Sequence, residues 1–146
     1  MNRYALIVAG GSGSRMGTVI PKQFLELAGK PVLMHTIEKF RKFESSIRII
    51  VVLPEDHIGL WHELTDKYSF PVSHDIVSGG ATRFESVKNG LQLIKSRGYV
   101  AIHDGVRPLV SRDTILRCFT EAERYGNAVP VSSPADSLRL ITDQGN

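Results

Sequence analysis

The sequence lacks several features that would indicate particular classes of protein. Its 146 residues contain one cysteine, Cys118, so an internal disulfide is excluded and a reducing, cytoplasmic setting is expected. No apolar run approaches the roughly 20 residues of a membrane-spanning helix, and the first apolar run starts too early to leave room for a signal peptide. The net charge of +3 is too small to indicate nucleic-acid binding. We therefore expect neither a nucleic acid nor a membrane as partner.

Familiar catalytic patterns are missing as well. No Ser-His-Asp or Cys-His set stands out, and the histidines show no metal-ligand spacing. The glycine-rich stretch near the N-terminus has no Gly-Lys-Ser/Thr, which a Walker A loop requires. It also fails as a dinucleotide fingerprint, because Met16 stands where the third glycine belongs. Anion binding of another kind has to explain this stretch.

Apolar runs alternate with amphipathic segments along the chain. Strands are expected at residues 4–9, 47–53 and 99–103, with weaker candidates at 73–77 and 127–131. Helices are expected at residues 31–43, 56–68, 81–97 and 111–125, the last beginning at Ser111 and ending at Gly126. This alternation predicts one α/β domain over residues 1–146, a mostly parallel sheet with helices on both faces. Ligands are then expected beyond the carboxyl ends of the strands.

Large apolar side chains at helical spacing are assigned to the core. They are Trp61, Tyr68, Phe84 and Phe119. Cys118 lies on an apolar helix face and is expected to be a buried, inert thiol.

The stretch AGGSGSRMGTVIPKQF, residues 9–24, follows the first strand directly. Glycines let backbone N–H groups approach phosphate oxygens without a Cβ in the way. Arg15 can direct two donors at one phosphate, and Lys22 adds a compact charge nearby. Two cations beside such a loop suit a triphosphate under substitution at phosphorus. The alternative is a glycine-rich turn in which both cations are simply solvated.

Two later stretches also follow expected strands. In GGATRFESV, residues 79–87, backbone groups and Ser86 are candidates for reading the edge of a base; the alternative is an ordinary turn with a solvated Arg83. In HDGVRP, residues 103–108, Asp104 can bind Mg²⁺ or a ribose hydroxyl, and Arg107 can hold a phosphate. The alternative is that Asp104 caps a turn and pairs with Arg107.

Four stretches in this order resemble a known family. They are AGGSGSRM with PKQF, GGATRFESV, HDGVRP, and Pro130-Val131 followed by Asp136-Ser137-Leu138. The combination is similar to nucleotidyltransferases that activate phosphorylated alcohols and sugars, and most closely to 2-C-methyl-D-erythritol 4-phosphate cytidylyltransferases of the non-mevalonate isoprenoid pathway. The resemblance implies a Rossmann-like fold of the nucleotide-diphospho-sugar transferase type. It also implies attack of an alcohol phosphate on CTP, with release of pyrophosphate.

The resemblance assigns a role to each matching residue. Arg15 and Lys22 would be catalytic, stabilising the charged transition state. Asp104, Arg107 and Ser137 would bind methylerythritol phosphate, with Asp104 also holding the Mg²⁺ that accompanies CTP. The nucleotide would contact Ala9, Gly10, Gly11, Ser12, Gly13, Ser14, Gly80, Arg83 and Ser86.

The chain is shorter than family members usually are. It ends within residues 133–146, where the resemblance places the start of a β-arm that pairs two subunits. We therefore expect a C-terminally truncated member, and a homodimer for the intact protein. Two other functions stay open, a ribitol- or other polyol-phosphate cytidylyltransferase and a non-catalytic nucleotide-binding module.

Overall fold

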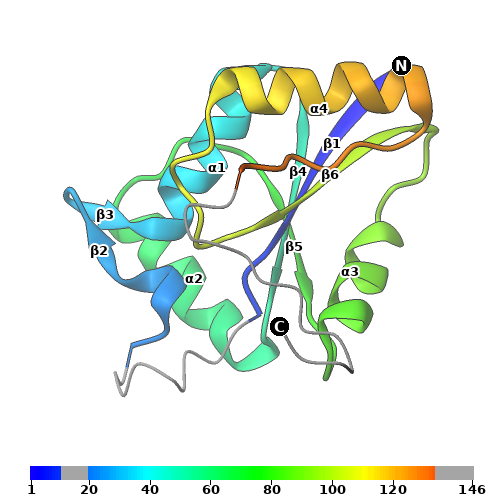
Figure 1. The fold of residues 1–146 in the computed structure, drawn as a ribbon. Helices are drawn as coiled ribbons and strands as arrows, with labels where there is room; N and C mark the ends of the chain where they lie inside the picture. Colours follow the sequence, from blue (N-terminus) through cyan, green and yellow to red (C-terminus); the bar gives the residue numbers. More distant parts are fainter. Residues whose placement is uncertain (11–19, 134–146) are drawn as a thin grey trace, which may run out of the picture.

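The computed structural model describes residues 1–10 and 20–133 and contains one parallel sheet of four strands in that part of the chain (Figure 1). Its strands are β1 (Asn2–Val8), β4 (Arg48–Leu53), β5 (Asp75–Ser78) and β6 (Gly98–Asp104). Their order is β5-β4-β1-β6, with every neighbouring pair parallel. The chain moves outward from β1 and then returns to its other side, and this reversal creates the switch point at which such sheets bind ligands.

The two central strands carry most of the core. In β1, Ala5 and Ile7 face one side of the sheet while Leu6 and Val8 face the other, and all four are buried. β4 alternates in the same way. A strand covered on both faces is apolar at consecutive positions, and this part of the sequence prediction is confirmed.

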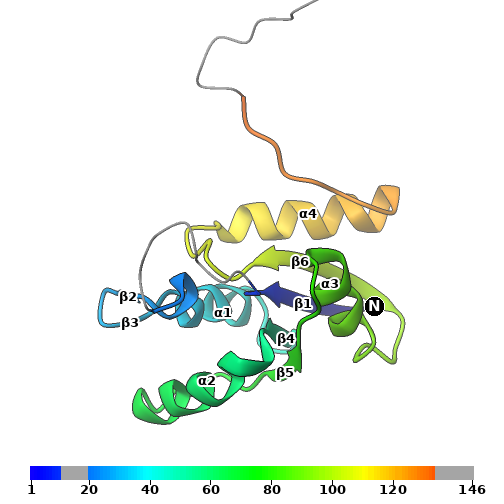
Figure 2. The same cartoon turned by 90° about the horizontal axis from the view of Figure 1, so that it is seen from below.

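Helices cover both faces of the sheet unequally. The larger core cluster includes side chains from α1 (Val32–Phe43), α2 (Glu55–Lys67) and α4 (Arg112–Tyr125). The opposite face is covered by α3 (Arg83–Leu91) and the turn after it, on the right of Figure 1 and in front of the sheet in Figure 2. The remaining elements are the 3-10 turn η2 (Lys22–Phe24) and a small antiparallel pair, β2 (Glu26–Leu27) and β3 (Lys30–Pro31). None of the described helices has the length and apolar character needed to cross a membrane.

Some local expectations are confirmed and others are wrong. α4 begins after a Ser111 cap and ends at Gly126, which has a φ of 91°. The expected strand at residues 127–131 is wrong, since this stretch is coil and Pro130 cannot donate to a ladder. The helix expected over residues 81–97 is shorter, because it starts after the Thr82 cap and ends at Leu91.

Two side chains expected in the core lie elsewhere. Phe84 is 75% exposed, because it occupies the outer side of the first turn of α3. Cys118 is only half-buried and lines a cavity of about 500 Å³ between β6, α4 and residues 126–130. Trp61 and Phe119 are buried as expected, and Tyr68 packs against the core.

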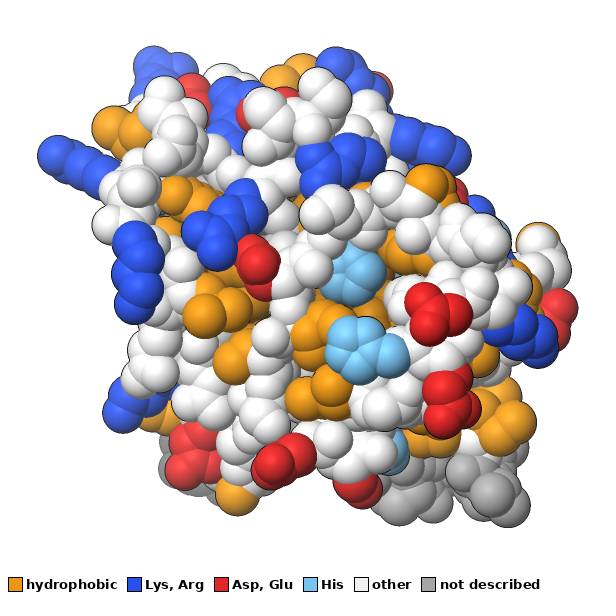
Figure 3. Space-filling model, turned by 180° about the vertical axis from the view of Figure 1, so that it is seen from behind, with side chains coloured by type: hydrophobic (Ala, Val, Ile, Leu, Met, Phe, Trp, Pro, Cys, Tyr) orange, Lys and Arg blue, Asp and Glu red, His pale blue; other side chains and the backbone are white. Residues whose placement is uncertain are grey.

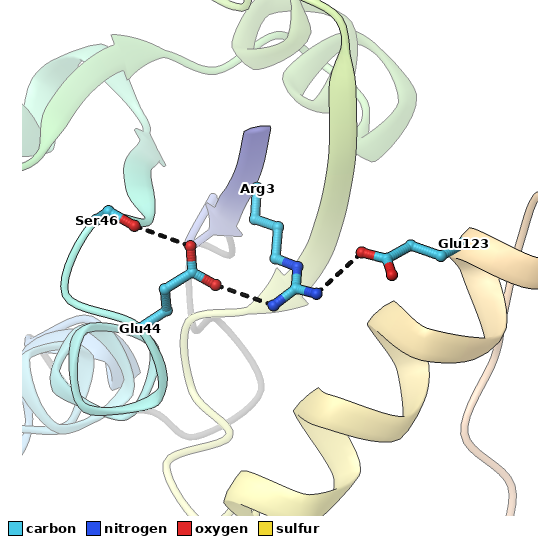
Figure 4. A network of polar contacts seen from close by, with 4 residues as sticks. All are labelled: Arg3, Glu44, Ser46 and Glu123. Atoms are coloured by element: carbon cyan, nitrogen blue, oxygen red, sulfur yellow. Dashed lines mark hydrogen bonds and ion pairs between the residues drawn. The ribbon is translucent and has the colours of Figure 1, made fainter. Parts of the chain in front are cut away.

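Charged contacts hold the amino end of the sheet. Arg3 of β1 donates to Glu44 at 3.0 Å and to Glu123 at 2.9 Å, so it links the end of α1 to α4 (Figure 4). Hydrogen bonds to these carboxylates raise the pKa of Arg3.

Figure 3 shows the surface of the molecule from behind. Basic side chains gather in its upper part, and histidines lie among hydrophobic side chains in the middle.

Candidate active site

The carboxyl ends of the strands are joined to one another by backbone hydrogen bonds. The N–H of Ala9 donates to Val52 O at 2.9 Å, and the N–H of Gly105 donates to Val8 O at 2.8 Å. The N–H of Gly79, the residue after β5, donates to Leu53 O of β4 at 2.7 Å and extends the pattern to the loop after β5. The loops after β1, β5 and β6 therefore leave the sheet side by side, as the sequence predicts for a ligand-binding edge.

Ser86 bonds to the loop after β5 and lies close to the glycine that follows β1. Its side chain is 4% exposed, and its Oγ accepts a hydrogen bond from the N–H of Gly80 at 3.1 Å. A Cβ built on Gly10 would lie 3.7 Å from the same Oγ, and one on Gly79 would lie 3.0 Å away. The Ser86 hydroxyl thus packs against the backbone of Gly10 and Gly79 and bonds to that of Gly80. Direct reading of a base by Ser86 stays a prediction.

Arg83, Asp104 and Arg107 form a charged cluster across two loops. Asp104 Oδ1 lies 2.7 Å from an Arg83 guanidinium nitrogen, and Oδ2 lies 2.8 Å from Arg107 Nε. The Asp104 side chain is 25% exposed, whereas those of Arg83 and Arg107 are 60% and 74% exposed. The ion pair between Asp104 and Arg107, one of the two interpretations of the sequence, is present. Arg83 is largely exposed to solvent, as the ordinary-turn interpretation expects, and it also pairs with Asp104.

A capping box fixes where Arg83 lies. Thr82 Oγ1 accepts from the N–H of Glu85 at 3.1 Å, and Glu85 Oε2 accepts from the N–H of Thr82 at 2.9 Å. These two bonds satisfy backbone donors at the start of α3 and make Arg83 the first helical residue. The guanidinium is therefore presented from a defined helix end, beside the end of β6.

The cluster carries an excess of positive charge. Two guanidinium groups face one carboxylate. Burial lowers the pKa of the neighbouring His103 imidazole, although Asp104 opposes the shift, so His103 adds no charge near neutral pH. Thr36 Oγ1 supports the same loop with a 2.8 Å bond to Gly105 O. An anionic ligand would be attracted here, and the exposed guanidinium groups could turn toward it.

The residues present allow only a limited metal site. Within the described residues, no group of three or more His, Cys, Asp or Glu side chains is arranged to hold an ion. Mg²⁺ in nucleotide enzymes is usually held by one or two carboxylates together with phosphate oxygens and water. Asp104 supplies the one carboxylate of the cluster for such a site, and because both of its oxygens pair with guanidinium groups, an ion would have to replace one of these contacts.

Lys22 lies at the start of η2, near the end of β1. Its side chain is half-buried and has no ion pair or side-chain hydrogen bond within residues 1–10 and 20–133. The next residue, Gln23, is buried, and its Nε2 donates to Ala9 O at 3.0 Å. Lys22 is thus attached to the same edge of the sheet as the charged cluster.

The structure brings together the predicted residues that it describes. Ala9, Gly10, Lys22, Gly80, Arg83, Ser86, Asp104 and Arg107 all lie at the ends of strands β1, β5 and β6 or beside them. The others lie outside the described residues: Gly11, Ser12, Gly13, Ser14, Arg15 and Ser137. The sequence analysis assigned no role to Gln23 or Thr36. The sequence feature that could have drawn attention to Gln23 is its primary amide side chain between Lys22 and the apolar Phe24.

Comparisons with known proteins agree with this geometry. The family model of 2-C-methyl-D-erythritol 4-phosphate cytidylyltransferase (IspD) matches residues 4–146. The protein of that name from Bacteroides thetaiotaomicron is 48% identical over 146 residues, which cover 100% of this chain and 67% of the relative. The one from Porphyromonas gingivalis is 55% identical over 144 residues, covering 99% of this chain and 64% of the relative.

A solved structure shows the same fold. The crystal structure of 4-diphosphocytidyl-2C-methyl-D-erythritol synthase from Anaerococcus prevotii has a TM-score of 0.76 at 28% identity, covering 99% of this chain and 61% of that one. The chain thus spans about two thirds of the length of the proteins it matches. With this fold, these motifs and these identities, the chain belongs to the 2-C-methyl-D-erythritol 4-phosphate cytidylyltransferase family.

Proposed function

We propose that the protein transfers the cytidylyl group of CTP to 2-C-methyl-D-erythritol 4-phosphate, forming 4-diphosphocytidyl-2-C-methyl-D-erythritol and pyrophosphate. The observation that supports this most is the gathering of cationic side chains at the carboxyl edge of the sheet. Arg83 and Arg107 pair with Asp104 at the end of β6, and Lys22 directly precedes Gln23, which is bonded to Ala9 O after β1. Such an edge suits two phosphorylated substrates that have to meet.

The reaction requires charge and alignment more than a reactive side chain. An oxygen of the acceptor phosphate forms a bond to the α-phosphorus of CTP, and the bond from that phosphorus to the bridging oxygen breaks, so pyrophosphate leaves with the electron pair. The attacking oxygen is already anionic, so no general base has to remove a proton. Catalysis then depends on holding the two phosphates in line and stabilising the extra negative charge.

Each cation has a place in this scheme. Lys22, together with Arg15 of the family motif, stabilises the charge that grows at the α-phosphate. Arg107 holds the phosphate of the acceptor, and Arg83 exchanges its contact with Asp104 for one with the nucleotide. Asp104 would hold Mg²⁺ together with the triphosphate, and the ion would supply charge neutralisation of the phosphate chain.

The second-substrate site and subunit pairing involve residues beyond the described part. Ser137 is proposed to contact methylerythritol phosphate, and the segment around residues 133–146 to begin an arm that pairs two subunits. Both proposals follow from the family motifs.

Pyrophosphate release tests the function directly. The assay supplies CTP with methylerythritol phosphate or with ribitol 5-phosphate, and UTP and GTP serve as nucleotide controls. Because the chain spans about two thirds of its relatives' length, a second protein extends it with the C-terminal part of the Bacteroides thetaiotaomicron relative.

We expect release with CTP and methylerythritol phosphate in the extended protein. A signal with ribitol 5-phosphate alone would identify a polyol-phosphate cytidylyltransferase. CTP binding without release from any acceptor would leave a nucleotide-binding module, and the proposed function would be wrong.

A further inference from the structure

Gln23 is an unusual residue to find in the interior of this protein. Its side chain is 1% exposed, and it is one of three buried polar or charged residues in the described chain, with Thr36 and Ser86. A buried primary amide is unfavourable unless its donors and acceptor find partners. The partners that Gln23 does have therefore indicate what its burial achieves.

The main partner of Gln23 is the residue just before the glycine-rich loop. Gln23 Nε2 donates to Ala9 O at 3.0 Å, across fourteen positions of sequence, and also lies 3.5 Å from His57 Nδ1. Ala9 is fixed on its other side, because its N–H donates to Val52 O in β4. Gln23 thus ties the chain after the loop to the chain before it, at a point anchored to the centre of the sheet.

Phe24 anchors the same segment from the neighbouring position. Its ring stacks on Trp61 with centroids 6.0 Å apart and meets the His57 ring edge-on at 5.8 Å. The N–H of Phe24 donates to Pro21 O at 2.9 Å, and that of Leu25 donates to Lys22 O at 3.2 Å. The backbone of Lys22 therefore lies inside a turn that is held by β1 on one side and by α2 on the other.

We infer that Gln23 is a positioning residue, whose amide fixes Lys22 relative to the end of β1. This inference rests on the proposed function, in which Lys22 acts on the α-phosphate. The rate of an in-line displacement is sensitive to small displacements of the stabilising charge, about 100-fold for 1 Å in unfavourable cases. Losing the amide donor should therefore affect turnover more than substrate binding.

Gln23→Met tests this, since methionine keeps the length and volume but cannot donate to Ala9 O. The matched control is Tyr4→Phe, which removes a 3.2 Å bond from the Tyr4 hydroxyl to Ser96 O near the opposite end of β1. Amide hydrogen exchange of residues 20–25 measures the turn itself. In the extended protein, kcat and the KM for CTP measure the effect on chemistry.

We expect Gln23→Met to exchange at least about tenfold faster in that segment, and kcat to fall about 10- to 100-fold with KM changed less than threefold. Should Gln23→Met not fold, Gln23→Asn, which keeps an amide that is too short to reach, replaces it. Exchange and kcat equal to those of Tyr4→Phe would overturn the inference.

The two proposals can fail separately. If the unsubstituted extended protein releases no pyrophosphate, the proposed function is wrong, and the exchange measurement still decides whether Gln23 holds the turn that contains Lys22. If release is normal and the segment exchanges at the same rate in both variants, only the role of Gln23 is wrong.

Discussion

Two anchors hold the loops at the carboxyl edge of the sheet, and they differ in almost every physical respect. One is the charged cluster of Arg83, Asp104 and Arg107, whose guanidinium groups are mostly exposed. The other is neutral and buried, with Gln23 bonded to Ala9 O and Phe24 stacked on Trp61. Exposed ion pairs exchange partners at little cost, whereas a buried amide bond is expensive to break. The first anchor can therefore pass its cations to a ligand, while the second holds the turn that contains Lys22, for which we propose a catalytic role.

The largest effect is expected for the cation that the neutral anchor holds. Lys22→Ala should lower kcat by about 1,000-fold with a much smaller change in the KM for CTP, because the ammonium stabilises charge that develops only in the transition state. Steady-state kinetics of the extended protein measure both constants. Lys39→Ala, an exposed residue of α1, is the control. Equal effects of Lys22→Ala on kcat and KM would mean that Lys22 only binds.

A smaller effect, of a different kind, is expected from the charged anchor. Asp104→Asn leaves two guanidinium groups facing a neutral amide, so they separate and present a poorer phosphate site. Because a hydrogen bond to a charged group contributes about 1.5–3 kcal/mol, the KM for the acceptor phosphate should rise about 10- to 100-fold.

Asp113→Asn, an exposed carboxylate in the first turn of α4, serves as the control for Asp104→Asn. A loss confined to kcat, with the acceptor KM unchanged, would contradict the role given to the two arginines. It would instead indicate that Asp104 acts in the chemical step.

Salt should affect the two anchors differently, and this test requires no substitution in the charged cluster. The screening length falls from about 10 Å at 0.1 M salt to about 3 Å at 1 M, so attraction by exposed guanidinium groups weakens. The KM for CTP of the unsubstituted protein should rise several-fold over this range. The ratio of kcat between Gln23→Met and the unsubstituted protein should stay constant, because a buried amide bond is not screened. A ratio that changes with salt would remove the distinction between the anchors.

Much of the sheet could be predicted from the sequence, because its signals are local. The runs that form β1 and β4 are apolar at consecutive positions, as strands covered on both faces require. Both ends of α4 were also predictable, since Ser111 and Gly126 cap it by local geometry.

Two features were predicted wrongly, one because hydrophobic spacing alone does not show where a helix begins, and one because a strand needs a partner strand. Phe84 has the spacing of a core residue, but the Thr82 cap starts α3 where that side chain faces outward. Residues 127–131 have strand character without a neighbouring strand to pair with among the described residues.

In the candidate site, too, the features with local sequence signals were predictable and the contacts between distant residues were not. Glycines and cations after strand ends predicted which loops would meet, because parallel strands deliver their carboxyl ends to one edge. The pairing of Arg83 with Asp104 was not visible, since it joins two loops through the fold. The burial of Gln23 was not visible either, because its partner Ala9 is fourteen positions away.

The smallest effect concerns the support behind the neutral anchor. Trp61, on which Phe24 stacks, donates from Nε1 to His74 Nε2 at 3.0 Å, and His74 Nδ1 in turn donates to Val72 O at 2.7 Å. The bond from Trp61 requires a neutral imidazole, because Nε2 must accept, whereas the bond to Val72 O is kept when the ring is protonated. Burial lowers the pKa of His74, although the Val72 carbonyl and Asp75 oppose the shift. The folded state therefore takes up the proton less readily than the unfolded chain, whose histidines titrate near pH 6.5.

Stability should then be complete above about pH 6.5 and decline as the pH falls through the lower pKa of folded His74. A protonated His74 ring would present an N–H to the N–H of Trp61, so this hydrogen bond would be lost. Because Trp61 is the single tryptophan of the chain, the loss of the bond should change the tryptophan fluorescence as well as Tm. We expect Tm to fall by about 2–4 °C between pH 7.5 and pH 5 from this contact. His74→Gln removes the titrating group, and His35→Gln, on α1, leaves it in place as the control. If His74→Gln shows the same pH dependence of Tm and of Trp61 fluorescence as the unsubstituted protein, His74 does not couple pH to the neutral anchor.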